Sequence, residues 1–163
     1  MTSLLSRLTV GGVLIAALGG AIAPAAVAAP APAAVDCAEG NVLKNAFHSA
    51  DKAGVGVVFN YHCKISVRDV SYLNPGEKPY QDGSGDPVKV KGKAFIRVVV
   101  DGYNWIGDTY TGPTRIAGEG AVTEIVHGGN FEGQSLWWIG VDKKRPFTKT
   151  VSGKSVTVTV KAA

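Results

Sequence analysis

The sequence predicts an all-β protein, a single β-sandwich domain of about seven to eight strands that are mainly antiparallel. Three observations support this prediction. Short segments alternate between apolar, often β-branched, residues and polar residues with a period of two, which is the pattern of half-buried strands. Turn-forming residues separate these segments, and the chain holds 21 Gly and 8 Pro. With 45% hydrophobic and 18% charged residues, 163 residues are enough for one domain with its own core. A closed β-barrel shares this strand pattern and is the alternative architecture.

The alternation is clearest near the end of the chain, where Val156, Val158 and Val160 alternate with Thr157 and Thr159. Taken in order, the expected strands cover residues 55–61, 64–73, 88–91, 93–100, 121–127, 134–141 and 156–161. Turn residues fall between them, as in the Q-D-G-S-G-D-P segment at 81–87. Residues 42–52 are the only plausible helical segment, and whether they form a short N-terminal helix is left open.

The first 28 residues have the pattern of a secretory signal peptide. Arg7 gives a positive start, residues 8–23 are apolar, and Ala26 and Ala28 supply the small side chains that precede a cleavage site. We expect cleavage after Ala28, although a retained membrane anchor is the alternative.

The mature chain then begins with an Ala/Pro-rich linker over residues 29–40, and the folded domain covers 41–163. This organisation predicts a secreted or extracytoplasmic protein without a membrane span in its mature form.

Two cysteines, Cys37 and Cys63, lie in the mature part of the chain. In an oxidising compartment such a pair most simply forms a disulfide. A loop of this size would contribute about 3–4 kcal/mol in the chain-entropy model. A reactive or metal-binding pair is the alternative, but the spacing fits no zinc motif.

Several short motifs follow one another in order from residue 81 onward. They are QDGSGDPVKVKG at 81–92, YTGP at 110–113, GNFEG at 129–133, WWIGVD at 137–142 and RPF at 145–147. This series, within residues 55–163, resembles the AMIN-like domain of secreted and lipoprotein actinobacterial proteins. The resemblance implies a β-sandwich outside the cytoplasm that is associated with the cell envelope or peptidoglycan. The chain departs from the family at 56–59, where Gly-Val-Val-Phe replaces the usual Asp-Arg-Val-Val-Phe.

The residues that would support catalysis or metal binding do not form a recognisable pattern. The segment at 133–137 lacks the last glycine of a nucleophile elbow, and His48, His62 and His127 are scattered. We therefore expect no enzyme activity, no cofactor and no metal. The net charge of +4, without an arginine-rich stripe, predicts mild attraction to anionic surfaces and no nucleic-acid binding.

Four basic residues share one phase of the alternation, opposite to the apolar one. They are Lys89, Lys91, Lys93 and Arg97. If a hairpin at Gly92 keeps them outward, they form a positive strip that could attract an anionic wall polymer. An ordinary solvated face, with lysines protecting an edge strand, explains them as well.

Aromatic residues form a second group of candidates. Tyr103 and Trp105 lie in a Gly-rich stretch, and Trp137 and Trp138 are adjacent, so their side chains point to opposite faces of a strand. One of these two should lie in the core, and the other should be exposed or covered by the loop of Trp105. An exposed ring could stack on a sugar, whereas buried rings would pack the loop onto the sandwich.

The sequence thus predicts a secreted, non-catalytic binding module. Its expected partner is peptidoglycan or another anionic wall polymer. The alternative is an extracellular structural or protein-interaction domain, with a secreted protein as partner and no affinity for glycan.

Overall fold

A computed structural model describes residue 37 and residues 42–102 and 110–162, and in this part of the chain it confirms the all-β prediction. Nine strands are present and every pair is antiparallel. They are β1 (Leu43–Asp51), β2 (Gly54–Tyr61), β3 (Ser66–Tyr72), β4 (Ala94–Asp101), β5 (Arg115–Ala117), β6 (Val122–Phe131), β7 (Gln134–Val141), β8 (Phe147–Ser152) and β9 (Ser155–Lys161).

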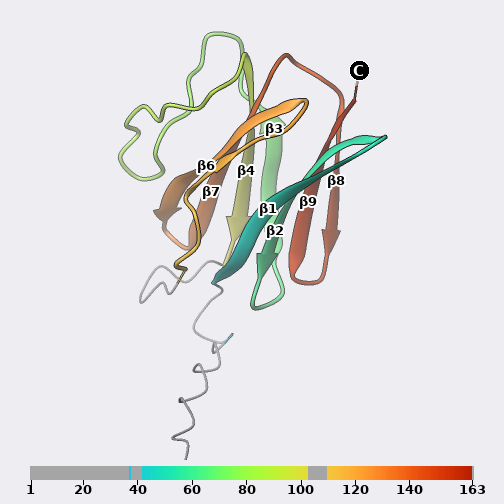
Figure 1. Ribbon diagram of the computed structural model, residues 1–163. Coiled ribbons are helices and arrows are strands. Elements are labelled where there is room, and N and C mark those ends of the chain that lie inside the picture. Colours follow the sequence, from blue (N-terminus) through green and yellow to red (C-terminus); the bar gives the residue numbers. More distant parts are fainter. Residues whose placement is uncertain (1–36, 38–41, 103–109, 163) are drawn as a thin grey trace, which may run out of the picture. The chain divides into compact units, whose positions relative to one another are not determined.

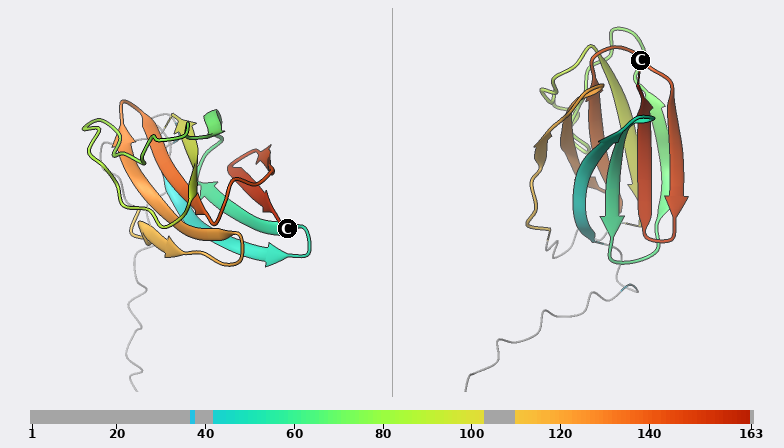
Figure 2. Two further views of the ribbon diagram at one scale, coloured as in Figure 1. Left: turned by 90° about the horizontal axis from the view of Figure 1, so that it is seen from above. Right: turned by 45° about the vertical axis from the view of Figure 1, so that its right-hand side comes forward.

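The strands form two sheets. The first has four strands in the order β1-β2-β9-β8, and the second has five in the order β3-β4-β7-β6-β5. The two sheets form separate layers, as Figures 1 and 2 show. This arrangement is a sandwich and not a closed barrel.

The core lies between the layers and follows from the alternation. Val156, Val158 and Val160 are fully buried, while the threonines between them face outward. Across the core, Phe59 of β2 packs on Trp137 of β7, with ring centroids 5.2 Å apart.

The short helix that the sequence allowed for residues 42–52 is absent. Residues 43–51 instead form β1, which pairs with β2 from Leu43↔Tyr61 to Asp51↔Gly54. An isolated helix of this length is marginal in water, whereas pairing with β2 satisfies the backbone and buries Leu43 and Ala46. The sequence patterns also missed β5 and β8, which lie at edges of the two sheets.

The strand expected at 88–91 is also absent. This segment belongs to a long connection between β3 and β4, residues 73–93, which we call the strap (the large yellow-green loop of Figure 1). Its two limbs are joined by the Tyr80↔Pro87 bridge and by the Val88 N–H, which donates to the Pro79 carbonyl over 2.9 Å. The limbs therefore pair with each other and do not extend either sheet.

The strap packs on the outer face of the five-stranded sheet. Trp138 points to this face, and its indole N–H donates to the Tyr80 carbonyl at 2.8 Å. A second apolar cluster forms here, separate from the main core. It comprises Val99, Val126, Leu136 and Trp138 of the sheet, with Leu73, Tyr80, Val88 and Val90 of the strap and Phe95 of β4.

A glycine in β7 allows this close approach. A Cβ on Gly140 would lie 1.9 Å from the carbonyl oxygen of Lys91. Since no side chain fits in this gap, the strap can reach the sheet here only over glycine.

The outer face of the four-stranded sheet is different, because it carries mainly hydroxyl and amide side chains. We call it the open face. Three of its cross-strand rows are Asn45, Asn60, Ser155 and Ser152; Phe47, Val58, Thr157 and Thr150; and Ser49, Gly56, Thr159 and Thr148. No charged residue occupies these three rows, whereas the next row, at one end of the sheet, holds Asp51 and Lys161. Phe47 keeps 42% of its surface exposed.

The predicted disulfide between Cys37 and Cys63 is present. It ties the chain before β1 to the residues that follow β2. The expected signal peptide (1–28) lies outside the described residues, and so does the expected linker (29–40) apart from Cys37. In the described part of the chain, no helix is long and apolar enough to cross a membrane.

Candidate functional site: a basic groove beside the strap

A largely apolar groove of about 890 Å³ lies between the strap and the edge of the five-stranded sheet. Its apolar lining comes from Pro79, Pro87, Val88 and Val90 of the strap and from Phe95 of β4. Its charged lining comes from Lys78, Lys89 and Lys91 of the strap, Arg115 of β5 and Glu124 of β6. A volume of this size is typical of sites for small ligands or short chain segments.

Glu124 holds the wall of the groove together. Its side chain is only 5% exposed, and its Oε2 lies 2.7 Å from Nη1 of Arg115 and accepts the Lys91 backbone N–H at 2.8 Å. Arg115 also donates from Nη2 to the Lys89 carbonyl at 2.9 Å. One buried carboxylate therefore fixes the strap, β5 and β6 against one another.

This network sets the ionisation of Glu124. Burial acts to raise the pKa of its carboxyl, but the Lys91 N–H and the Arg115 guanidinium stabilise the charged form more strongly. The pKa of Glu124 consequently lies below its ordinary value. The carboxylate is charged at neutral pH and already has its partners.

The cations of the groove outnumber this single carboxylate. The side chains of Lys78, Lys89 and Lys91 are exposed, and none of them forms an ion pair with an acid of the described residues. Arg115 keeps 49% of its side chain exposed while it binds Glu124. The groove thus combines an apolar floor with four cationic side chains and a single carboxylate.

The basic residues predicted to form one strip are divided among three places. Lys89 and Lys91 line the groove, whereas Lys93 lines a neighbouring hollow of about 370 Å³. Arg97 lies in β4 and donates to Asp69 at 2.9 Å and to the Tyr80 hydroxyl at 3.1 Å. The predicted single strip is wrong because residues 88–91 cross the sheet as part of the strap and do not pair with β4 as a hairpin.

The two adjacent tryptophans are both fully buried. Trp137 faces the main core, and Trp138 lies beneath the strap, where Tyr80 packs on it edge to face with ring centroids 5.2 Å apart. Neither ring is available to stack on a sugar. Of the two alternatives for the outer tryptophan, exposure is therefore wrong, and a connection does cover the ring, but the covering residues belong to the strap. The other two aromatic candidates, Tyr103 and Trp105, lie outside the described residues.

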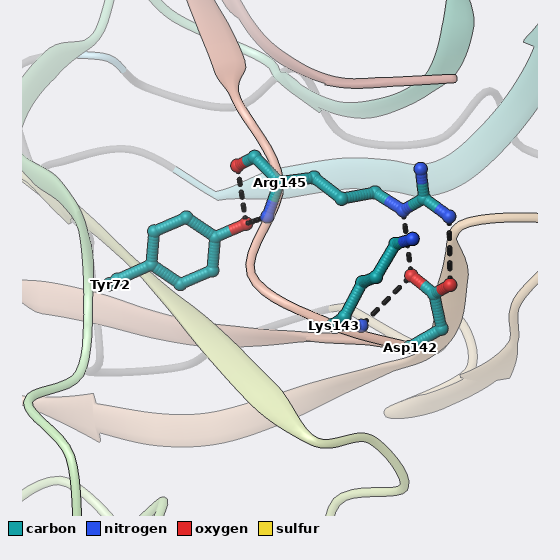
Figure 3. Close-up of polar contacts among 4 residues, drawn as sticks. All are labelled: Tyr72, Asp142, Lys143 and Arg145. Carbon is teal, nitrogen blue, oxygen red and sulfur yellow. Dashed lines mark hydrogen bonds and ion pairs between the residues drawn. The ribbon is translucent and has the colours of Figure 1, made fainter. Parts of the chain in front are cut away.

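A second polar cluster lies where the chain passes from β7 to β8 (Figure 3). Arg145 donates to both carboxylate oxygens of Asp142, each at 2.8 Å, and the Tyr72 hydroxyl donates to the Arg145 carbonyl at 2.8 Å and accepts from its N–H at 3.1 Å. The hydrogen bonds from Arg145 lower the pKa of Asp142 to about 2. These hydrogen bonds join the connection between β7 and β8 to the end of β3, so we call the cluster a structural clamp.

Of the ten residues that line the groove, the sequence patterns identified only Lys89 and Lys91 as site residues. Among the eight that they missed, Arg115 and Glu124 come from β5 and β6, Phe95 from β4 and Lys78 from the strap. Each is unremarkable in its own segment, and only the path of the strap brings them together. In the described chain, no three His, Cys, Asp or Glu side chains gather as metal ligands.

Comparison with known proteins identifies the family. A family model, the AMIN-like domain, matches residues 56–161, which is more than half of the chain. The chain belongs to the AMIN-like domain family. The matched region contains seven of the nine strands in full (β3 to β9) and β2 from Gly56 onward, and it includes every residue that lines the groove. No curated protein and no solved structure gives a significant match. Membership in the AMIN-like family points to a module of the cell envelope, and the disulfide fits an extracytoplasmic location.

Proposed function

We propose that this AMIN-like domain is a non-catalytic module of the cell envelope that binds peptidoglycan or another anionic wall polymer through the basic groove. The observation that supports this most directly is the groove itself, an apolar floor with three unpaired lysines and a fixed arginine beside it. An anionic polymer with some apolar surface complements both features. The position of the groove within the matched family region supports the same conclusion.

Co-sedimentation of the purified protein with peptidoglycan sacculi tests this function. The informative variant is Lys89→Gln with Lys91→Gln, which removes two exposed charges from the groove. It leaves the hydrogen bonds around Glu124 and Arg115 intact, because Lys89 and Lys91 contact Arg115, Glu124 and Thr123 through their backbones. The matched control is Lys149→Gln with Lys154→Gln, which removes the same charge from exposed positions of β8 and the turn after it.

We expect the groove variant to bind sacculi about tenfold more weakly at roughly 0.15 M salt, and the control to bind like the wild type. Equal binding by all three proteins would overturn the assignment to the groove. Pelleting that occurs only at low salt, and falls equally in both variants, would show diffuse charge attraction instead of a site.

A second candidate function is a protein-interaction domain without affinity for glycan. The feature that favours it is β8, an edge strand that pairs only with β9 and is exposed at five of its six residues, including Val151 at 45%. Unpaired edges can add a strand from a partner. If the protein does not pellet with sacculi, chemical crosslinking at Lys149 in the native extracellular fraction would test this function.

A further inference from the structure

We propose that the groove recognises the acidic peptides of the wall polymer and not its glycan strands. This inference rests on the proposed function and specifies the part of the polymer that enters the groove. It follows from the hydrogen-bonding chemistry of the side chains that line the groove.

The groove offers donors and almost no acceptors. Its polar side chains are the cationic Lys78, Lys89, Lys91 and Arg115 and the carboxylate of Glu124, and no Asn, Gln, Ser or Thr lines it. The Glu124 Oε2 already binds Arg115 and the Lys91 N–H. A sugar hydroxyl both donates and accepts, and an amide does likewise, whereas a carboxylate only accepts. Carboxylates are therefore the groups that such a donor set satisfies.

The floor of the groove favours small apolar groups over sugar rings. It consists of Pro79, Pro87, Val88 and Val90, with the half-buried Phe95 at one end. Trp138 does not line the groove and is fully buried beneath the strap. Sugar recognition usually uses an exposed aromatic face, while the methyl groups of a short peptide can pack on prolines and valines.

The charge of the groove sets how acidic the ligand must be. Glu124 forms an ion pair with Arg115, and none of the three lysines forms an ion pair with an acid of the described residues, although the charge of Lys91 also acts on Glu124. A peptide with several carboxylates would neutralise them, and the exposed lysine side chains can adapt to the spacing of its charges. Arg115 is different, because the Glu124 carboxylate and the Lys89 carbonyl hold its guanidinium in place. We infer that Arg115 anchors one carboxylate and the lysines bind the others.

The test separates the two parts of one wall preparation. Amidase digestion of sacculi yields free peptides and glycan strands, and this hydrolysis leaves a free carboxylate on each lactyl group from which a peptide was removed. These glycan carboxylates are converted to amides, and then each fraction is titrated into the purified protein by calorimetry and added as a competitor in the pelleting assay. We expect the peptide fraction to bind and to compete, with at least about tenfold higher affinity than the glycan strands. Peptides whose carboxylates have been converted to amides should lose binding, and so should the Lys89→Gln/Lys91→Gln variant.

The outcomes distinguish this inference from the function on which it rests. Pelleting that depends on Lys89 and Lys91, but is competed by glycan strands as well as by peptides, overturns the inference and leaves the proposed function in place. Equal binding of the native and amidated peptides overturns it as well, because it removes the role of the carboxylates. Pelleting that is insensitive to the groove variant overturns the proposed function itself, and absence of calorimetric binding by the peptides then overturns the inference too.

Discussion

The two sheets of this AMIN-like domain differ most on their outer faces. On the five-stranded sheet, the outward side chains include Val99, Val126, Leu136 and Trp138, and the strap covers them. On the four-stranded sheet, the outward side chains are mostly hydroxyls and amides, and they form the exposed rows of the open face. Both sheets obey the same alternation of strand residues, and both bury one face against the core.

The difference shows how the outward residues of a sheet determine what can cover it. A row of large apolar side chains gains free energy from a covering segment, so the strap contributes to stability while it shapes the groove. A row of threonines is satisfied by water and gains little from being covered. The binding site that we propose therefore arises on the covered face, where a rigid floor positions the charges, and not on the open face.

The largest expected effect comes from removing the side chain at the centre of the covered face, Trp138. Trp138→Ala should lower the free energy of unfolding by about 3–5 kcal/mol, because it deletes a fully buried ring and the anchor of Tyr80. Urea denaturation followed by far-UV circular dichroism measures this loss. The matched change on the open face is Thr157→Ala, which should cost less than about 0.5 kcal/mol. Similar losses at the two positions would mean that the strap does not add to the core.

A smaller effect is expected where the strap comes closest to the sheet. Gly140→Ala places a methyl group against the Lys91 carbonyl, so the strap must move away. We expect a loss of about 1–3 kcal/mol, as for other overpacked sites. Hydrogen exchange should show faster exchange of the Lys91 amide, which donates to Glu124. An unchanged Lys91 amide would show that β7 shifts and the strap stays.

A third effect, similar in size at neutral pH and smaller in acid, concerns the charge of Glu124 that holds the groove together. Glu124→Gln should cost about 1–3 kcal/mol at pH 7, because it weakens the hydrogen bonds to Lys91 and Arg115. The pKa of Glu124 is lowered in the folded protein, so its stabilisation is present above the pKa of the unfolded chain and is lost as the pH falls through the folded value. The difference between variant and wild type should therefore shrink in acid.

Urea midpoints at about pH 7, 5 and 3 would check this prediction against the ordinary carboxyl pKa near 4. Asp86→Asn, at an exposed position of the strap, is the matched control and should behave like the wild type. The Glu124→Gln variant and the wild type both keep the Asp142–Arg145 clamp, in which the pKa of Asp142 is about 2. Both proteins therefore still lose stability in strong acid. A difference in stability between Glu124→Gln and the wild type that stays constant from neutral to acidic pH would contradict the role assigned to Glu124.

Much of the fold was predictable because its signals are local. Six of the seven expected segments are strands, including the valine-rich β9, and the disulfide followed from the number of cysteines and the expected compartment. The strand β1 was missed because its apolar residues, such as Leu43 and Ala46, are spaced for either a helix or an irregular strand. β5 was missed because three residues are too short to show a period.

The site was only partly predictable. The alternation of basic residues predicted Lys89 and Lys91 as candidate binding residues, and both line the groove. The same pattern included Lys93 and Arg97, which the structure places elsewhere. Adjacent tryptophans in a strand do point to opposite faces, but local sequence does not show that the strap covers the outer one.

The sequence by itself determined the alternation, and with it the fold class, the inward faces of most strands and the family. These follow from the local preference of β-branched residues for strands and from the burial of every second side chain. Only the tertiary structure decided that 88–91 would cross a sheet instead of joining it, and that Arg115, Glu124 and the strap lysines would share one groove. The physical reason is that the path of a long connection depends on contacts such as Trp138 with Tyr80 and Gly140 with Lys91, which join residues about 50 or more positions apart.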